Sequence, residues 1–497
     1  MFCLPVFYFF SYLNFSNAAR ILFVTMPVGT SHAGSMGAFM KKLVQSGHQV
    51  AFYSEAYSYF KLPAGVKNRQ ILIAKPAADT RSDPNFIRSI WQEDSGGSDL
   101  YLVWMYSPGF YADVINRESQ PFQHLINDTW DLVLTDYMFT ISGIPIAHHQ
   151  NRLAGFFKSC LSYHWDNYFR GVTHPSGLIP PFFMSHDRAV WEPENFWDRL
   201  FDDLQSWSIF WYLYFPLKWT IQESISNEYS YFNWHDWYRH NQISFSDYLE
   251  LIFPSPISNQ FVNIGSHCDT KIIEPLPDRL RAFVDDSESN GTILIAFGTV
   301  VSWDKAPREK LNAFVNGLSH FNDFRIVWSF DGDASWLPQN FFTAAWLPQN
   351  DLLNHPKTKL FISHGGMKSL RETICAEVPA LYVPLFAEQV RNSFIARRLG
   401  FGGYLNKRNL TAEEIQREVK RVLNNPNSRS NVVKAKAMWL DKPKPGLDLG
   451  AFWVTKMLKL KGLPDKYFKP KPDRYFLHTI YFDWVIVLLS LFVFSAK

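Results

Sequence analysis

The first part of the chain alternates between continuous apolar runs and a helical pattern. Residues 21–26 form an apolar run of strand length, and a glycine-bearing turn at 29–34 follows it. Apolar side chains then recur at helical spacing over 36–44, and a second apolar run occupies 50–53. A strand, a helix and a second strand in this order are typical of a parallel α/β sheet.

Another short apolar run, residues 132–134, leads into Thr135 and Asp136. Open α/β sheets bind ligands at the carboxyl ends of their strands, so this position favours a site. The second half repeats the pattern after a polar, proline-bearing stretch near 270–290. Further strands are predicted at 292–296, 325–330, 359–363 and 380–383. The predicted fold class is α/β, with two doubly wound domains at 19–275 and 285–460.

Residues 155–250 differ from the rest, because they contain eight tryptophans and many other aromatic residues without a clear period. The segment is interpreted as an insertion that lines an apolar pocket or rests on a bilayer. Ordinary aromatic core packing explains any single tryptophan equally well.

Composition narrows the classes of function. The 497 residues are 47% hydrophobic and 19% charged, which suits large cores and excludes a disordered chain. A formal net charge of +3 is too small for this length to indicate a nucleic-acid partner. Four cysteines are too few for a disulfide framework, and at most one bridge is left if Cys3 is removed with a signal peptide. Neither they nor the histidines form a metal-binding motif, so no metal site is predicted.

Both ends of the chain are apolar. Residues 1–18 are interpreted as a secretory signal peptide, with a buried first strand as the alternative. Residues 476–497 are interpreted as a transmembrane anchor, although the uncharged run at 484–496 covers only about 20 Å of a hydrocarbon core about 30 Å thick. A truncated anchor is one form of this interpretation, and a hydrophobic tail helix packed on the body is the alternative. Together the two ends predict a single-pass membrane protein with lumenal domains. Glycosylation acceptors would then be Asn127, Asn290 and Asn409.

The most specific motif is the His-Gly-Gly sequence at 364–366, which ends one predicted strand and leads into a helix beginning near Lys368. Backbone N–H groups and the positive end of the helix dipole would point at a ligand above the glycines, which suits a phosphate or diphosphate. Ser369 and Glu372 follow on neighbouring faces of that helix, where a carboxylate can bind ribose hydroxyls.

The block at 346–389 resembles the signature of the UDP-glucuronosyltransferase/UDP-glycosyltransferase family, since it reads WLPQNDLLNHPKTKLFISHGGMKSLRETICAEVPALYVPLFAEQ. The likeness is strong over roughly 290–425 and weaker in the first half, where GHQVAFYS and DLVLTD carry it. It implies a GT-B fold, in which two Rossmann-like domains face a cleft. It also implies that the carboxy-terminal domain holds most of the UDP-sugar.

Carried over position by position, the resemblance implies roles for residues at both ends of the donor. Trp346 would stack on uracil, Gln349 would assist at the nucleoside and Glu372 would bind ribose. Glu388 and Gln389 would bind sugar hydroxyls. Glu388 replaces the aspartate usual in the family, and its extra methylene leaves the identity of the sugar open.

The resemblance also implies a diphosphate site built from two turns. His364 and Gly366 form one, and the loop ILIAFGTVVS, with Gly298 and Thr299, forms the other. Lys368 stands where the family usually has asparagine, so a cation there would either strengthen the hold on the diphosphate or point to solvent.

Two further departures concern the surroundings of the motif. Glu377 occupies a position that is usually glycine, which suggests a locally altered turn. A second WLPQN sequence begins at Trp336, and because DLLNHP follows only the copy at Trp346, we interpret Trp336 as a loop aromatic.

Sugar transfer to a hydroxyl needs a base, and histidine suits this role because its usual pKa of about 6.5 leaves it neutral at physiological pH. His32 lies in the first strand-helix turn, where the resemblance places the base. Asp136 ends a strand of the same sheet, where the family places the carboxylate that orients it. As in a serine-hydrolase triad without the serine, the aspartate would fix the tautomer and stabilise the imidazolium.

The sequence therefore predicts a UDP-glycosyltransferase that moves a glucuronosyl or glucosyl group from a UDP-sugar co-substrate to a hydroxyl of a small lipophilic acceptor. The expected mechanism is inverting, independent of metal ions and without a cofactor. A UDP-sugar-binding membrane protein without transferase activity is the first alternative. A twin-domain oxidoreductase is the second, and the spacing of Gly29, Gly34 and Gly37 argues against it. The sequence leaves the oligomeric state open, and a homo-oligomer is one option.

Overall fold

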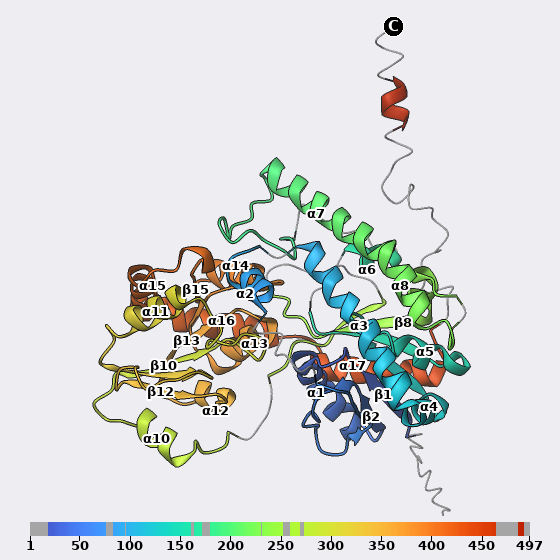
Figure 1. The fold of residues 1–497 in the computed structure, drawn as a ribbon, viewed down its shortest axis with the longest axis horizontal. Helices are drawn as coiled ribbons and strands as arrows, with labels where there is room; N and C mark the ends of the chain where they lie inside the picture. Colours follow the sequence, from blue (N-terminus) through green and yellow to red (C-terminus); the bar gives the residue numbers. More distant parts are fainter. Residues whose placement is uncertain are drawn as a thin grey trace, which may run out of the picture.

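The computed structural model describes residues 18–75, 83–94, 96–160, 164–170, 179–229, 231–251, 259–268, 273–463 and 486–491. Two α/β domains lie side by side in Figure 1. All but the last residue of the predicted signal peptide at 1–18, and most of the predicted anchor at 476–497, fall outside the described residues. In the ranges that are described, no helix combines the length and the apolar character needed to cross a bilayer.

The amino-terminal sheet contains, among the described residues, seven parallel strands in the order β4-β2-β1-β6-β7-β8-β9. Their bounds are β1 Arg20–Val24, β2 Gln49–Tyr53, β4 Lys67–Asn68, β6 Leu132–Asp136, β7 Ala154–Lys158, β8 Asn241–Ser246 and β9 Phe261–Asn263. A small separate pair consists of β3 Glu55–Ala56 and β5 Ile71–Leu72. The strand order reverses between β1 and β6, and this reversal is the point at which open α/β sheets bind ligands.

Nine helices are described in this half of the chain. They are α1 Thr30–Gln45, α2 Pro84–Trp91, α3 Gly97–Arg117, α4 Ser119–Asn127, α5 Gly143–His148, α6 His164–Phe169, α7 Phe196–Tyr214, α8 Pro216–Ser224 and α9 Trp234–His240. The central strand β1 is fully buried from Ile21 to Val24, which explains why the sequence there is a continuous apolar run rather than an alternating one.

The carboxy-terminal sheet has six described strands, all parallel, in the order β12-β11-β10-β13-β14-β15. The strands are β10 Gly291–Ala296, β11 Phe324–Ser329, β12 Phe341–Ala344, β13 Thr358–Ser363, β14 Ala380–Tyr382 and β15 Gly402–Tyr404. The helices are α10 Asp278–Val284, α11 Arg308–Leu318, α12 Gln349–Leu353, α13 Met367–Ala376, α14 Gln389–Arg398, α15 Ala412–Asn424, α16 Asn427–Leu440 and α17 Gly446–Leu460. This sheet reverses between β10 and β13, so the prediction of two doubly wound domains is confirmed.

Two elements cross between the domains, and the sequence-based division at 19–275 and 285–460 does not anticipate them. Helix α17 packs on α1 and joins the amino-terminal core through Val454 and Met457. In the opposite direction, Trp91 at the end of α2 packs in the carboxy-terminal core, where its ring lies 5.1 Å from that of Trp303.

A buried ion pair fixes α13 to the amino-terminal domain. The guanidinium of Arg371, on α13, contacts both carboxylate oxygens of Asp247 at 2.8 and 2.6 Å, and Asp247 directly follows β8. Nε2 of His267 lies 3.0 Å from the same carboxylate. Although burial raises the pKa of Asp247, the charges and hydrogen bonds of Arg371 and His267 outweigh burial and lower it, so the carboxylate stays ionised at neutral pH.

A disulfide joins Cys268, in the linker after β9, to Cys375 near the carboxyl end of α13. The sequence allows at most one bridge once Cys3 is set aside, but it does not specify the pairing. Cys160 is a free, buried thiol. Helix α13 is therefore held to the rest of the chain by an ion pair at its centre and a covalent bond near its end.

The turn at Glu377 holds a residue with a side chain in a backbone conformation that favours glycine. Glu377 adopts the left-handed conformation, with φ of 58°, at the C-cap of α13, which is the conformation that glycine adopts without strain. Its carboxylate pairs with Lys436 at 2.9 Å, and this contact offsets part of the backbone strain.

We expect the substitution Glu377→Gly to stabilise the protein by about 0.5–1 kcal/mol, because the left-handed conformation costs a side-chain-bearing residue about 1–2 kcal/mol and a partly exposed ion pair contributes at most about 1 kcal/mol. Urea unfolding curves would measure the difference. Glu377→Ala keeps the strained conformation and loses the ion pair, so it should destabilise. A stability ranking with alanine above glycine would contradict this account of the turn.

Candidate active site

His32 and Asp136 meet at the switch point of the amino-terminal sheet. His32 lies in the first turn of α1, directly after β1, and Asp136 is the last residue of β6. Since β1 and β6 are adjacent parallel strands, their carboxyl ends lie together. Nδ1 of His32 is 2.6 Å from Oδ2 of Asp136, whose side chain is fully buried, while the imidazole is 20% exposed. The predicted pairing is therefore present in the structure.

The hydrogen bonds around this pair determine which imidazole nitrogen is free. A carboxylate can only accept, so Nδ1 of His32 carries the proton and Nε2 keeps its lone pair. The Thr25 hydroxyl donates to the same Asp136 oxygen at 3.2 Å, and Oγ of Ser159 lies 2.9 Å from Nδ1 of His32. The imidazole is thus oriented with its basic nitrogen available to a substrate.

Electrostatics adjust the basicity of His32. Burial lowers its pKa, but the charge and hydrogen bond of Asp136 and the charge of Glu388 together raise the pKa above its ordinary value. Glu388 belongs to the carboxy-terminal domain, so the second domain influences the imidazole of the first.

The two predicted phosphate-facing turns meet at the switch point of the carboxy-terminal sheet. Gly298 follows β10, and His364 follows the neighbouring strand β13. A methyl group on Gly298, whose φ is +73°, would lie 3.1 Å from Cε1 of His364, and one on Gly366 would lie 2.7 Å from Nε2. The imidazole of His364 is therefore enclosed between two glycine turns that leave no room for a side chain.

His364 is neutral at physiological pH, because burial lowers its pKa to about 4. It can exchange hydrogen bonds with a diphosphate but does not supply a full positive charge. The amino end of α13, which begins at Met367, carries positive potential beside this ring, and the next residue, Lys368, is exposed.

Contacts across the domain interface bring the two switch points together. Nζ of Lys368 lies 3.3 Å from the position of a methyl group on Gly34 of α1. Burial raises the pKa of Glu388, while hydrogen bonds from its own backbone and that of Met367, and the charges of His32 and Arg391, act to lower it. The His32–Asp136 pair of one domain and the glycine turns of the other therefore lie at one shared interface.

The predicted nucleoside residues also lie close to one another. Gln349, the first residue of α12, donates a hydrogen bond to the Glu372 carboxylate of α13. Trp346 precedes α12 and is 77% exposed, so its ring is accessible for stacking. The indole N–H of Trp336 instead donates to the backbone oxygen of Asp333 at 2.8 Å, which agrees with its interpretation as a loop aromatic.

A profile of the UDP-glucoronosyl and UDP-glucosyl transferase family matches residues 20–493. The chain belongs to this family. It is therefore a UDP-glycosyltransferase, an enzyme that transfers a sugar from a UDP-sugar donor to an acceptor. The chain is 25% identical to human UDP-glucuronosyltransferase 1A10 over 471 residues, which cover 91% of this chain and 85% of the human protein. It is 27% identical to mouse UDP-glucuronosyltransferase 1-2 over 478 residues, with the same two shares covered.

Solved structures confirm the GT-B fold of this UDP-glycosyltransferase. The glycosyltransferase of kitacinnamycin matches with a TM-score of 0.59 at 14% identity, over 89% of this chain and 99% of its own. The glycosyltransferase VinC, solved in complex with DTDP, matches with a TM-score of 0.55 at 17% identity, over 88% of this chain and 99% of its own.

Three of the residues predicted to bind the UDP-sugar in this UDP-glycosyltransferase differ in burial and in hydrogen bonding. Ser369 is buried in α13, whereas Thr299 is exposed after β10. Gln389 is also buried, and its amide oxygen accepts the backbone N–H groups of Leu385 and Phe386 at 2.8 and 3.1 Å. That oxygen already supports the loop before α14, so only the amide nitrogen of Gln389 is left for a sugar hydroxyl.

Sequence reasoning missed Thr25 and Ser159, which contact the His32–Asp136 pair. Thr25 directly follows β1 and Ser159 directly follows β7, and both of these strands are buried. Asp136 is likewise the last residue of β6. The same signal, a polar residue after an apolar run, could have identified them. In the described part of the chain, no cluster of His, Cys, Asp or Glu has the geometry of a metal site.

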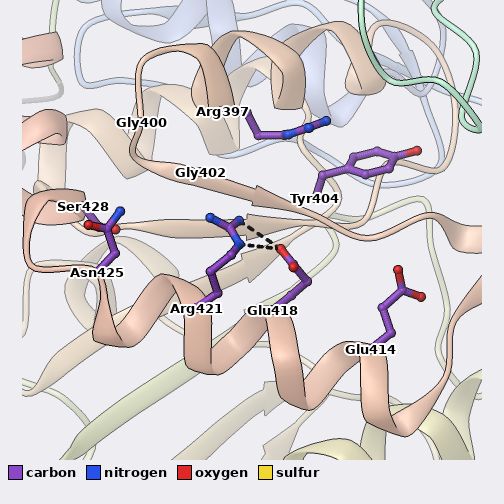
Figure 2. A pocket seen from close by; sticks show the side chains of 9 residues that line it. All are labelled: Arg397, Gly400, Gly402, Tyr404, Glu414, Glu418, Arg421, Asn425 and Ser428. Atoms are coloured by element: carbon purple, nitrogen blue, oxygen red, sulfur yellow. Dashed lines mark hydrogen bonds and ion pairs between the residues drawn. The ribbon is translucent and has the colours of Figure 1, made fainter.

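A cavity of about 330 Å³ lies elsewhere in the carboxy-terminal domain (Figure 2). It is bordered by α14, β15 and α15, and the sticks in Figure 2 show Arg421 directed at Glu418. None of the predicted donor or catalytic residues lines it, so it is separate from the active site.

We expect Gly366→Ala to weaken UDP binding at least tenfold, because the added methyl group would collide with His364 in the diphosphate site. Isothermal titration calorimetry with UDP measures the change. Gly109→Ala in α3 is the matched control, since nothing lies within 4 Å of its added methyl group. Equal affinity of the two variants would show that UDP does not use the glycine turn.

Proposed function

We propose that this UDP-glycosyltransferase transfers a glucuronosyl or glucosyl group to a hydroxyl of a small lipophilic acceptor, with inversion and with His32 as the general base. Nε2 of His32 accepts the hydroxyl proton while the acceptor oxygen bonds to the anomeric carbon. The bond from that carbon to the diphosphate oxygen breaks, and UDP leaves with the electron pair. A single displacement of this kind inverts the anomeric centre.

The observation that carries this proposal is the 2.6 Å contact between His32 and Asp136 at the interface that also holds the glycine turns. Asp136 fixes the tautomer and stabilises the imidazolium as it forms. On the donor side, Trp346 would stack on uracil, and Gln349 and Glu372 would bind the nucleoside. Glu388 and Gln389 would contact the sugar.

Departure of UDP needs positive potential at the diphosphate. We propose that the amino end of α13 and Lys368 supply it, together with N–H groups of the turns at Gly298 and Gly366. These groups belong to the chain itself, so the proposed mechanism needs neither a metal ion nor a cofactor.

We further propose that the catalytic domains lie in the lumen of the endoplasmic reticulum, with residues 1–18 as signal peptide and 476–497 as anchor. The disulfide between Cys268 and Cys375 supports this location, because such bonds persist in oxidising compartments and are rare in the cytosol.

The substitution His32→Ala should reduce turnover by about 10²–10⁴-fold, which is the usual contribution of a general base. The assay is UDP release from UDP-glucuronate and UDP-glucose with a panel of phenols and steroids. UDP affinity should stay unchanged, since His32 lies on the acceptor side.

His320→Ala is the matched control, because this histidine is exposed at the end of α11 and bonds only its own helix in the described structure. Running the assay with and without EDTA tests independence of metal ions. Full turnover of the His32 variant would exclude His32 as the base.

The pH profile provides a separate test of the interdomain electrostatics. His32 must be neutral to accept a proton, and its raised pKa places the acid limb of kcat/KM above the ordinary value of about 6.5. Glu388→Gln removes a negative charge that raises this pKa, so the limb should move to lower pH. Glu377→Gln removes the same charge at the far end of α13 and should leave the limb in place. A limb unmoved by Glu388→Gln would contradict the coupling.

A further inference from the structure

The first half of helix α7 has a polar side facing the protein and large apolar side chains facing outward, while Ile209 in the second half packs in the core. Asp198, Asp202 and Ser206 recur at helical spacing and are all buried. The outward side chains are largely exposed: Trp197 59%, Phe201 61%, Leu204 56% and Trp211 46%. A helix on the surface of a water-soluble domain has the opposite arrangement.

The polar side of α7 is held in place by specific contacts. Asp198 forms an ion pair with Arg188 and accepts the backbone N–H of Glu192 at 3.1 Å. Asp202 is hydrogen-bonded to Ser206, and burial together with the charge of Asp203 raises its pKa to about 8 although Arg391 acts to lower it, so this carboxyl is mostly protonated at neutral pH. These contacts fix the rotation of the helix about its axis, so the aromatic side cannot turn inward.

The exposed apolar surface continues onto two neighbouring helices. Trp219 on α8 and Tyr106 on α3 are 68% and 66% exposed. Helix α3 lies against both α7 and α8, and the Thr220 hydroxyl is 3.8 Å from the sulfur of Met105. Figure 1 shows α7 along one edge of the molecule, with α3 and α8 beside it. An exposed apolar surface that spans three helices indicates a contact with another apolar phase.

The types of residue on this surface indicate a bilayer interface. Tryptophan and tyrosine concentrate at the level of lipid headgroups, because their rings are apolar and their N–H and O–H groups are polar. Lys218 extends its ammonium over the rings of Trp219 and Tyr231, at 5.6 and 5.3 Å from their centres. A long side chain with its charge at the border of an apolar surface is typical of a lysine that reaches from the acyl region to the headgroups.

The same chain carries a second feature that would bring it to a membrane. The run at 484–496 is apolar and uncharged, and its described part, 486–491, has large exposed side chains such as Leu488. If this run inserts into a membrane, a lipid bilayer is close to the protein and can cover the exposed surface of α7.

We propose that α7, α8 and the middle of α3 form a bilayer-contact face, through which the amino-terminal domain lies in the interfacial layer of a membrane. The face is defined by Trp197, Phe201, Leu204, Trp211, Trp219 and Tyr106. It has few cations, so apolar burial drives the contact and a neutral phosphatidylcholine surface is sufficient. This proposal does not depend on the catalytic mechanism.

The test uses the full chain in phosphatidylcholine nanodiscs in which some acyl chains carry a diazirine. After photolysis, mass spectrometry of peptides identifies the labelled segments. We expect label in α7 and α8, and we expect it to persist in 0.5 M salt, about the concentration at which exposed charges are screened beyond a few ångströms. The variant Trp197→Ser/Phe201→Ser/Leu204→Ser should lose at least five-sixths of the α7 label and keep its label at 484–496.

The matched control replaces three exposed apolar residues of the carboxy-terminal half, Val433→Ser, Met438→Ser and Phe452→Ser, and should leave labelling unchanged. Label confined to 484–496 in the wild-type chain would overturn the proposal, whether or not the triple variant folds. Loss of the α7 label in salt would also overturn it, and so would crosslinks that join α7 to a second copy of the chain instead of to lipid.

Discussion

The buried ion pair between Asp247 and Arg371 is the contact on which the geometry of the active site depends. It connects the end of β8 in one domain to the centre of α13 in the other. Removing one partner of such a pair costs about 3–5 kcal/mol, because the other charge is left without compensation. The bond between Cys268 and Cys375 fastens the same helix near its carboxyl end. With its centre and end held, the amino end of α13 is directed at α1, and the glycine turns lie at the same interface as His32.

The pKa values of the two histidines of the site move in opposite directions, because one ring is buried alone and the other is buried beside a carboxylate. His364 is enclosed by glycine turns without a charged partner, so burial lowers its pKa to about 4 and the ring stays neutral. His32 is also largely buried, but the charges of Asp136 and Glu388 raise its pKa. In the proposed mechanism, a neutral ring suits the donor side, which must release a charged product, and a stronger base suits the acceptor side.

Local pattern and the family resemblance together predicted the parts of the site that lie at strand ends. His32, Asp136, His364 and Gly298 all follow apolar runs, and parallel strands place such residues together at the switch points of the two sheets. The Cys268–Cys375 pairing and the Asp247–Arg371 ion pair join segments far apart in the chain, and no local period specifies which distant partner each residue meets. The environment of Gln389 could not be predicted for a related reason. Its side-chain oxygen accepts hydrogen bonds from the backbone of Leu385 and Phe386, which only the folded loop brings near.

The sequence pattern could not predict which side of α7 faces the protein, for a different reason. A helix with an acidic stripe and an aromatic stripe can pack either stripe inward, so its sequence does not say which side faces the protein. The decision rests with the ion pair between Asp198 and Arg188 and with the packing of Ile209 in the core. With these contacts made, the exposed aromatic side chains of α7 face outward, and the outward arrangement is favourable beside a phase that is itself apolar. The orientation of α7 thus links the interior electrostatics of the enzyme to the surroundings in which it works.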